Sequence, residues 1–346
     1  MYESFFGLSG NPFKLSPDPD FYYDSPIHKR AYAYLEYGLY QGEGFIVITG
    51  EVGAGKTTIV RNLLAHLDAS KVVAAHLVST MLDADDLVRA VCAAFGLPTR
   101  GTDKGSLLAE LEQFLKSIAL ERKRALLIVD EAQNLTARAI EELRMLSNFQ
   151  ISDRGLLQSF LVGQPELRKV MQHPSMQQLR QRVIASYHLG ALDRQESIRY
   201  IEHRMVHVGW KRQDPTFEPG TMDAIYAFTA GIPRRINLVC NRLLLSAFLR
   251  DAHVLTPDDV GTVADELKEE LGPTTSGSQD KPDRSNHGRD ATDPLVGNGD
   301  EAALAVPEEG EHLTERVVRL EKTLTVVLNT LRRLVRVIEP AARQES

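Results

Sequence analysis

Residues 50–58 read GEVGAGKTT, and most of the other motifs in the chain can be related to this stretch. They fit the pattern G-x-x-x-x-G-K-[ST], in which glycines let successive backbone N–H groups point inward around a phosphate. The preceding residues, Phe45–Thr49, form a short apolar run typical of a buried strand, and residues 58–67 continue at helical spacing. Bound phosphates would therefore lie at a helix N-terminus. The flanking strand and helix argue against a glycine-rich turn that matches by chance.

We expect this loop to bind a nucleotide. Lys56 adds a mobile cation for the phosphates and is also expected to act in catalysis, and the hydroxyl of Thr57 is suited to bind Mg²⁺. The expected nucleotide-binding residues are Gly50, Glu51, Val52, Gly53, Ala54, Gly55, Lys56, Thr57 and Thr58.

A second informative segment is ALLIVDE, residues 125–131. Four consecutive apolar residues predict a central strand buried on both faces, and two acids follow it. Asp130 is expected to bind Mg²⁺, and Glu131 to polarise a water that attacks the γ-phosphate. One further strand candidate, Val72–Val78, lies between the two motifs, which suits a P-loop ATPase with an inserted strand. An exposed pair of strand-end acids is the weaker alternative.

Polar residues also accompany two later strand candidates. Leu157–Val162 is followed by Gln164, whose side chain could contact the γ-phosphate or the attacking water. Arg180 and Arg182 precede a final strand, Ala185–Leu189, where an arginine commonly faces out of its own subunit. The alternative for at least one of them is an ordinary solvated arginine at a helix end.

The N-terminal segment NPFKLSPDPDFYY, residues 11–23, is rich in proline and aromatic residues. Pro12, Pro17 and Pro19 prevent a regular helix. The rings could pack on an adenine or could cover the first strand, and the sequence does not separate these alternatives. A helical pattern follows over residues 27–40.

From Asp193 the pattern becomes helical, and Asp193 with Glu196 resembles a capping box. We expect a small all-helical lid, in which Arg234 lies at a helix start and could reach the nucleotide. The alternative is that Arg234 and Arg235 only pair with acids. Helices are expected at 219–229, 233–251 and 257–271, the last capped by Thr256 with Pro257 in its first turn.

The last part of the chain contains two different patterns. Residues 272–310 have almost no large apolar side chains and are expected to form a disordered, flexible linker. Residues 311–340 carry a heptad pattern that predicts a C-terminal coiled-coil helix, although a basic amphipathic helix on a membrane is the competing interpretation. The expected domains are residues 1–190 for nucleotide binding, 191–271 for the lid, then the linker and the helix.

Composition gives weaker constraints. The formal net charge of −7 argues mildly against a protein that coats nucleic acid. Cys92 and Cys240 lack metal-ligand spacing and are expected to be buried thiols in a reducing compartment. The N-terminus has no secretory pattern, and the chain has no apolar run of membrane-spanning length. We therefore expect a cytoplasmic location. Peripheral contact with the inner membrane through the C-terminal helix stays open.

Six segments occur in a fixed order: GEVGAGKTT, LLIVDEAQNL, EELRMLSNFQ, FLVGQPEL, LRQRVIASYHL and GIPRRINLVCNRLLL. In this order they resemble the AAA+ ATPases of the ExeA/GspA general-secretion type. Two N-terminal stretches, residues 1–23 and 37–58, are similar to the secretion ATPase of PEP-CTERM/exosortase loci. The resemblance covers residues 1–271. It implies an α/β P-loop (AAA+) fold, a parallel sheet flanked by helices, that binds and hydrolyses ATP with Mg²⁺.

The resemblance also implies residue roles. Thr57 and Asp130 would coordinate Mg²⁺, and Glu131 would be the catalytic base. Gln164 matches the sensor-1 position, where many AAA+ proteins have Asn, and Arg234 matches the sensor-2 position. Arg182 is the better candidate for an arginine finger, with Arg180 second.

The function implied is ATP hydrolysis coupled to assembly or regulation of an envelope export or exopolysaccharide system, in a homo-oligomer with envelope proteins as partners. ExeA proteins continue into a transmembrane helix and a peptidoglycan-binding domain, and we expect neither here. The alternative is an ATP-dependent DNA-binding switch of the transposition type, which the acidic composition disfavours. A P-loop kinase of small molecules is disfavoured by the adjacent acids and the lid.

Overall fold

The computed structural model describes residues 1–16, 18, 21–78, 82–101 and 103–271. The expected linker, residues 272–310, and the expected C-terminal helix, residues 311–340, lie outside the described residues. The choice between a coiled coil and a membrane-bound helix therefore stays open.

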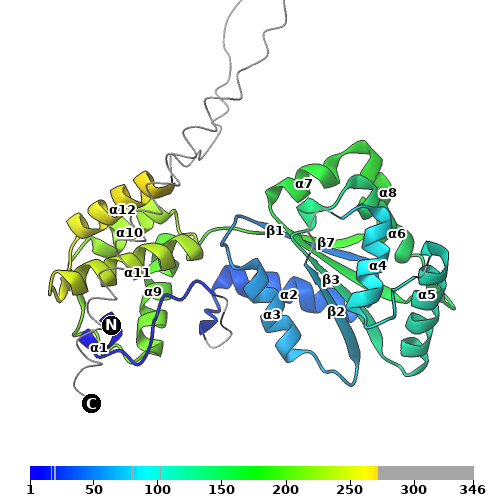
Figure 1. Cartoon of the computed structure of the whole chain (residues 1–346), viewed down its shortest axis with the longest axis horizontal. Helices are drawn as coiled ribbons and strands as arrows, with labels where there is room; N and C mark the ends of the chain where they lie inside the picture. Colours follow the sequence, from blue (N-terminus) through cyan, green and yellow to red (C-terminus); the bar gives the residue numbers. More distant parts are fainter. Residues whose placement is uncertain (17, 19–20, 79–81, 102, 272–346) are drawn as a thin grey trace, which may run out of the picture. The chain divides into compact units, whose positions relative to one another are not determined.

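The nucleotide-binding part is built on a five-stranded parallel sheet (Figure 1). The strand order is β2-β3-β6-β1-β7, so β1 lies between two strands that come much later in the chain. All five strands occur where the sequence predicts them. Their bounds are β1 Phe45–Gly50, β2 Val72–Val78, β3 Arg124–Asp130, β6 Leu157–Gly163 and β7 Val183–Leu189.

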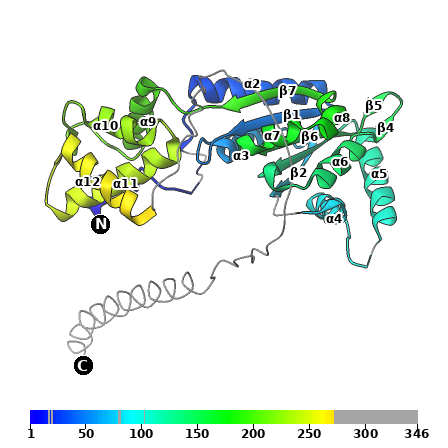
Figure 2. The same cartoon turned by 90° about the horizontal axis from the view of Figure 1, so that it is seen from above.

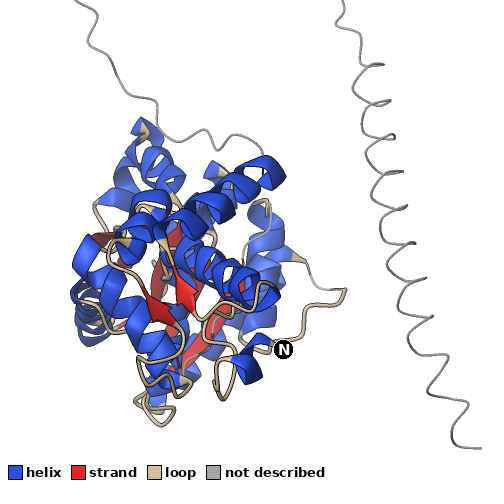
Figure 3. Cartoon of the chain, turned by 90° about the vertical axis from the view of Figure 1, so that its left-hand side faces the viewer, coloured by secondary structure: helices blue, strands red, loops and turns tan. Residues whose placement is uncertain are grey.

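Helices cover both faces of the sheet, as Figure 2 shows. Successive side chains of a strand point to opposite faces, and β1 follows this rule: Ile46 and Ile48 pack with α2 and α3, whereas Phe45 and Val47 pack with α4, α5 and α6. The five helices are α2 Pro26–Gln41, α3 Lys56–His66, α4 Ala84–Ala94, α5 Lys104–Leu120 and α6 Ala137–Leu146. In Figure 3 the strands lie enclosed by helices.

Several short elements connect these layers. The hairpin of β4 and β5 turns at Ser152 and Asp153, which both have positive φ, and the sequence analysis did not anticipate it. The short elements are β4 Gln150–Ile151, β5 Arg154–Gly155, α7 Pro165–Gln172, α8 Gln177–Arg180 and the 3₁₀ turns η2 Ala132–Asn134 and η3 Pro174–Met176.

The helical lid begins as the sequence predicts. Asp193 accepts a hydrogen bond from the Glu196 backbone, and the Glu196 side chain accepts one from the Asp193 backbone, which completes a capping box. Thr256 caps the last helix by accepting from the backbone N–H of Asp259. The helices are α9 Arg194–His207, α10 Thr221–Thr229, α11 Pro233–Leu249 and α12 Pro257–Leu271.

The lid is not entirely helical. Strand β8, Thr216–Phe217, pairs in parallel with β9, Val254–Leu255. Each strand is two residues long, too short to give a periodic signal in the sequence. The expectation of an all-helical lid therefore needs this correction.

The N-terminal segment packs with the lid. Helix α1, Tyr2–Phe5, opens it, and the buried rings of Tyr2, Phe13 and Phe21 belong to the same apolar cluster as α9 and α11. The Tyr2 hydroxyl donates a hydrogen bond to Asn241 on α11. Residues 1–190 therefore do not all pack around the sheet, although the functional division of the chain stays a prediction.

Two further expectations concern burial and membranes. Cys92 and Cys240 are free, buried thiols, as expected. Within the described ranges, no helix combines the length and apolar character needed to cross a bilayer.

Candidate nucleotide-binding site

The loop between β1 and α3 has the backbone that phosphate binding requires. Gly53 and Gly55 have φ values of 84° and 100°, in the left-handed region that other residues avoid. Lys56 is 6% exposed, and its ammonium donates hydrogen bonds to the carbonyls of Gly50 (2.7 Å) and Glu51 (2.9 Å). Burial lowers the pKa of Lys56, while the carboxylates of Glu131 and Asp130 oppose that shift. This loop can therefore present a cation and several N–H groups to phosphates.

His28 supports the loop from α2, and the sequence analysis missed it. Its Nε2 lies 3.2 Å from the Ala54 carbonyl, and its Nδ1 lies 2.7 Å from the Ser25 hydroxyl. Because a carbonyl only accepts, Nε2 carries a proton, and in the neutral imidazole Nδ1 then accepts from the Ser25 hydroxyl. Burial lowers the pKa of His28. A Cβ at Gly55 would lie 2.6 Å from Nε2, so the glycine is required sterically too.

Thr57 and Asp130 meet at the carboxyl ends of β1 and β3. The Thr57 hydroxyl donates to Asp130 Oδ2 at 3.0 Å, and the Asp130 side chain is buried. His76 on β2 lies 4.0 Å from the same oxygen. A hydroxyl and one carboxylate fit Mg²⁺, which is usually bound by one or two protein oxygens together with substrate phosphates. In the described part of the chain, no group of three or more His, Cys, Asp or Glu side chains could hold a metal by itself.

Glu131 is held by two amide side chains. The residue has φ 54°, and its carboxylate Oε2 accepts hydrogen bonds from Gln133 Nε2 (2.7 Å) and Gln164 Nε2 (3.3 Å). Gln133 also accepts from the backbone N–H of Gln164 at 2.9 Å. Gln164 therefore lies at the end of β6, where the sequence places it, and contacts Glu131; its contact with a phosphate or an attacking water stays a prediction. Gln133 was missed, although its position two residues after Glu131 could have drawn attention to it.

The lid touches the phosphate loop through the start of α11. The backbone N–H of Arg234 donates to the Gly53 carbonyl at 3.2 Å, and a Cβ at Gly53 would lie 2.3 Å from the Arg234 Cβ. The Arg234 side chain is exposed and lines the cavity beside the loop. No acid within the described ranges forms an ion pair with it, so the alternative of simple pairing finds no support.

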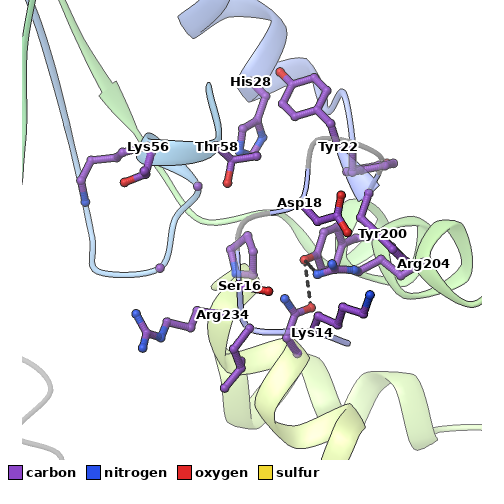
Figure 4. Close-up of a pocket in the computed structure, with 18 of the residues that line it drawn as sticks. Lys14, Ser16, Asp18, Tyr22, His28, Lys56, Thr58, Tyr200, Arg204 and Arg234 are labelled. Atoms are coloured by element: carbon purple, nitrogen blue, oxygen red, sulfur yellow. Dashed lines mark hydrogen bonds between the residues drawn. The ribbon is translucent and has the colours of Figure 1, made fainter. Parts of the chain in front are cut away.

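A cavity of about 190 Å³ runs from the phosphate loop to the lid (Figure 4). Phe21, Tyr22 and Tyr23 line it, so the aromatic N-terminal segment forms part of its wall. Tyr22 also packs against the apolar cluster that contains β1 residues. Tyr22 therefore helps to cover the first strand, whereas contact of these rings with an adenine stays a prediction.

The two candidate finger arginines lie elsewhere. Arg182 donates to the Ser147 hydroxyl at 2.7 Å, and Arg180 donates to the carbonyls of Met171 (2.7 Å) and His173 (2.8 Å). Both precede β7, at its amino end, and neither lines the cavity that contains Lys56. Any action of these arginines on a phosphate would have to be on another subunit, and that assignment stays a prediction.

Comparison with known proteins agrees with this geometry. The family described as "AAA domain" matches residues 39–171. The chain is 40% identical over 269 residues to the General secretion pathway protein A of Aeromonas hydrophila. The chain belongs to the AAA+ ATPases. Its similarity to that relative agrees with the general-secretion type that the six segments indicate. The match covers 77% of this chain but 48% of the relative, so the chain spans about half the length of that protein.

Solved AAA+ structures share the fold. Cdc6p from Pyrobaculum aerophilum gives a TM-score of 0.56 at 15% identity and covers 78% of this chain and 73% of that chain. The ORC2 protein of Aeropyrum pernix gives 0.54 at 19% identity, with 73% and 68% covered. At these identities the likeness concerns the fold alone.

Proposed function

We propose that this protein binds ATP with Mg²⁺ and hydrolyses it in the cavity between the phosphate loop and the lid. The observation that supports the proposal most is the meeting of Thr57 and Asp130 at 3.0 Å, directly beside a Glu131 carboxylate oriented by two amides. A hydroxyl and an acid at a cation site with a second, oriented acid next to them are the parts that phosphoryl transfer to water requires.

Each residue has a distinct role in this proposal. Lys56 and the loop N–H groups bind the β- and γ-phosphates, and Thr57 with Asp130 holds Mg²⁺. When bound, the ion neutralises the charge that develops on the phosphates. Glu131 orients and deprotonates the attacking water, Gln164 contacts that water or the γ-phosphate, and Arg234 reaches the nucleotide from the lid.

The ATP and Mg²⁺ proposal is tested by calorimetry of ATP binding with and without Mg²⁺. Asp130→Asn keeps the size of the side chain and removes its charge. It should abolish the part of the ATP affinity that depends on Mg²⁺ and leave the affinity in EDTA unchanged. Equal affinities of the wild type with and without Mg²⁺ would contradict the assignment of Thr57 and Asp130.

The hydrolysis is proposed to drive assembly or regulation of an envelope export or exopolysaccharide system. Support comes from the 40% identity to a protein named for the general secretion pathway. A homo-oligomer is proposed, with envelope proteins as partners and peripheral contact to the inner membrane. The DNA-switch alternative gains no support, because the likeness to the solved structures concerns the fold alone.

Capture of partners would test the export role. Glu131→Gln is expected to stay loaded with ATP, whereas Lys56→Ala is expected to stay empty, so the two variants form a matched pair. Envelope-assembly proteins should be retained from the producing cell by Glu131→Gln and not by Lys56→Ala. Retention of nucleic acid in their place, lost at raised salt, would favour the DNA switch.

A further inference from the structure

The lid contributes a buried arginine to the cavity. Arg204 on α9 is 5% exposed and lines the cavity (Figure 4). Its guanidinium lies 4.9 Å from the ring centre of Phe21 and 5.5 Å from that of Tyr200. It donates to the Tyr200 hydroxyl at 2.8 Å, and that hydroxyl donates to Asn237 Oδ1 at 2.9 Å. The two rings and the hydroxyl hold the guanidinium in one position.

The charge of Arg204 is not neutralised within the described ranges. No carboxylate there forms an ion pair with it, and its Nε is buried without any acceptor. A buried guanidinium that no carboxylate neutralises, with its Nε left without an acceptor, lowers the stability of the free protein. This arrangement is what a ligand-binding residue shows when its ligand supplies the missing acceptor.

The position of Arg204 indicates which part of a ligand it meets. Lys56 and Arg204 lie at different ends of the cavity in Figure 4, with the aromatic N-terminal segment beside Arg204. A nucleotide whose phosphates bind at Lys56 would extend its nucleoside towards Arg204, Phe21 and Tyr22. Purine bases carry ring nitrogens that accept hydrogen bonds, and arginine is well suited to donate to a base edge.

We propose that Arg204, fixed by Tyr200 and Asn237, is the base-recognition residue of the nucleotide site and donates a hydrogen bond to the purine ring from the lid. The inference rests on the proposed binding of ATP and adds the residue that reads its base. Base binding would then join α9 to the phosphate loop, because one ligand contacts both.

The stability of the nucleotide-free protein distinguishes a ligand-binding role of Arg204 from a purely structural one. If the guanidinium served only to pack Phe21 against the lid, its removal would lower the melting temperature of the nucleotide-free protein. If it is kept for a ligand, Arg204→Met should melt at the same temperature or higher without nucleotide, because it removes an unpaired buried charge and keeps an apolar stem. The melting-temperature rise produced by ADP should shrink in the same variant.

The deciding experiment compares ADP with pyrophosphate by calorimetry in the presence of Mg²⁺. Both ligands use the phosphate loop, and only ADP has a base. Arg204→Met should lower the affinity for ADP about 10- to 100-fold, the range for one hydrogen bond to a charged group. The affinity for pyrophosphate should stay within about 2-fold of the wild-type value. Arg204→Lys keeps the charge without the planar fork and should lose ADP affinity as well. Arg199→Met, on the exposed side of α9, is the matched control and should change neither.

The contrary results distinguish a failure of this inference from a failure of the proposed function. An equal loss of affinity for both ligands, or no loss of affinity for ADP, would overturn the base assignment and leave ATP binding intact. A loss that disappears with 2′,3′-dideoxy-ADP would place the contact on the ribose and overturn it too. Failure of the wild type to bind either ligand would overturn the proposed function together with this inference.

Discussion

Substitution of Gly53 by alanine would test the contact between the phosphate loop and the lid. Gly53 has φ 84°, and its carbonyl accepts a hydrogen bond from the backbone of Arg234. An added Cβ would lie 2.3 Å from the Arg234 Cβ, a distance that requires one of the two segments to move. The variant should therefore separate the start of α11 from the loop.

The expected cost follows from two contributions. A left-handed backbone costs an alanine about 1–2 kcal/mol relative to glycine. Moving α11 away adds the loss of one backbone hydrogen bond, about 0.5–1.5 kcal/mol. Gly53→Ala should thus lower the free energy of unfolding by about 1.5–3.5 kcal/mol.

Gly96 provides the matched control. Its φ is 80°, close to that of Gly53, but nothing lies within 4 Å of an added Cβ. Gly96→Ala should cost only the backbone contribution, about 1–2 kcal/mol. Urea denaturation of the two variants therefore isolates the lid contact, and ADP affinity should fall in Gly53→Ala alone. Equal losses of stability in both variants would refute the contact.

Three further predictions concern single side chains. Gln133→Leu should lower the turnover number about 10- to 100-fold with ATP affinity nearly unchanged, because Glu131 loses its shorter hydrogen bond; unchanged turnover would reject a positioning role. Burial lowers the pKa of His28, so its neutral form stabilises the fold fully above about pH 6.5 and this contribution is lost as pH falls towards the folded pKa. His28→Gln should therefore reduce the fall in urea midpoint between about pH 7.5 and about pH 5.5, and an identical fall would count against it. Arg182→Ala should abolish a rise of ATPase activity with protein concentration, and mixing it with inactive Glu131→Gln subunits should restore part of the activity if the arginine acts on a neighbour; no recovery in mixed oligomers would move the assignment to Arg180.

The sequence predicted those features that have local signals. Each strand of the sheet is an apolar run, and the starts of α9 and α12 carry caps at Asp193 and Thr256 that can be identified from residue type and spacing. The phosphate loop and the acids after β3 are contiguous motifs with fixed chemistry. For these reasons the fold and the placement of Lys56, Thr57 and Asp130 followed from the sequence.

The features that were missed depend on contacts between distant segments. His28 acts on the Ala54 carbonyl from a helix that precedes the loop, and no spacing rule connects the two. Arg204 appears in the sequence as one charged residue in a helix, and its burial becomes evident only when Phe21 is placed against it. The packing of the N-terminal segment on the lid likewise requires tertiary structure, because its prolines and rings carry no regular period.

The central claim is that Glu131 activates the water that attacks ATP bound at Lys56. It is tested most directly by measuring phosphate release and ATP binding together in the wild type and in Glu131→Gln. The account predicts that Glu131→Gln binds ATP within about 3-fold of the wild type and loses at least about 10²-fold in turnover, because only the base is removed. Turnover that persists in Glu131→Gln at near the wild-type rate would contradict it.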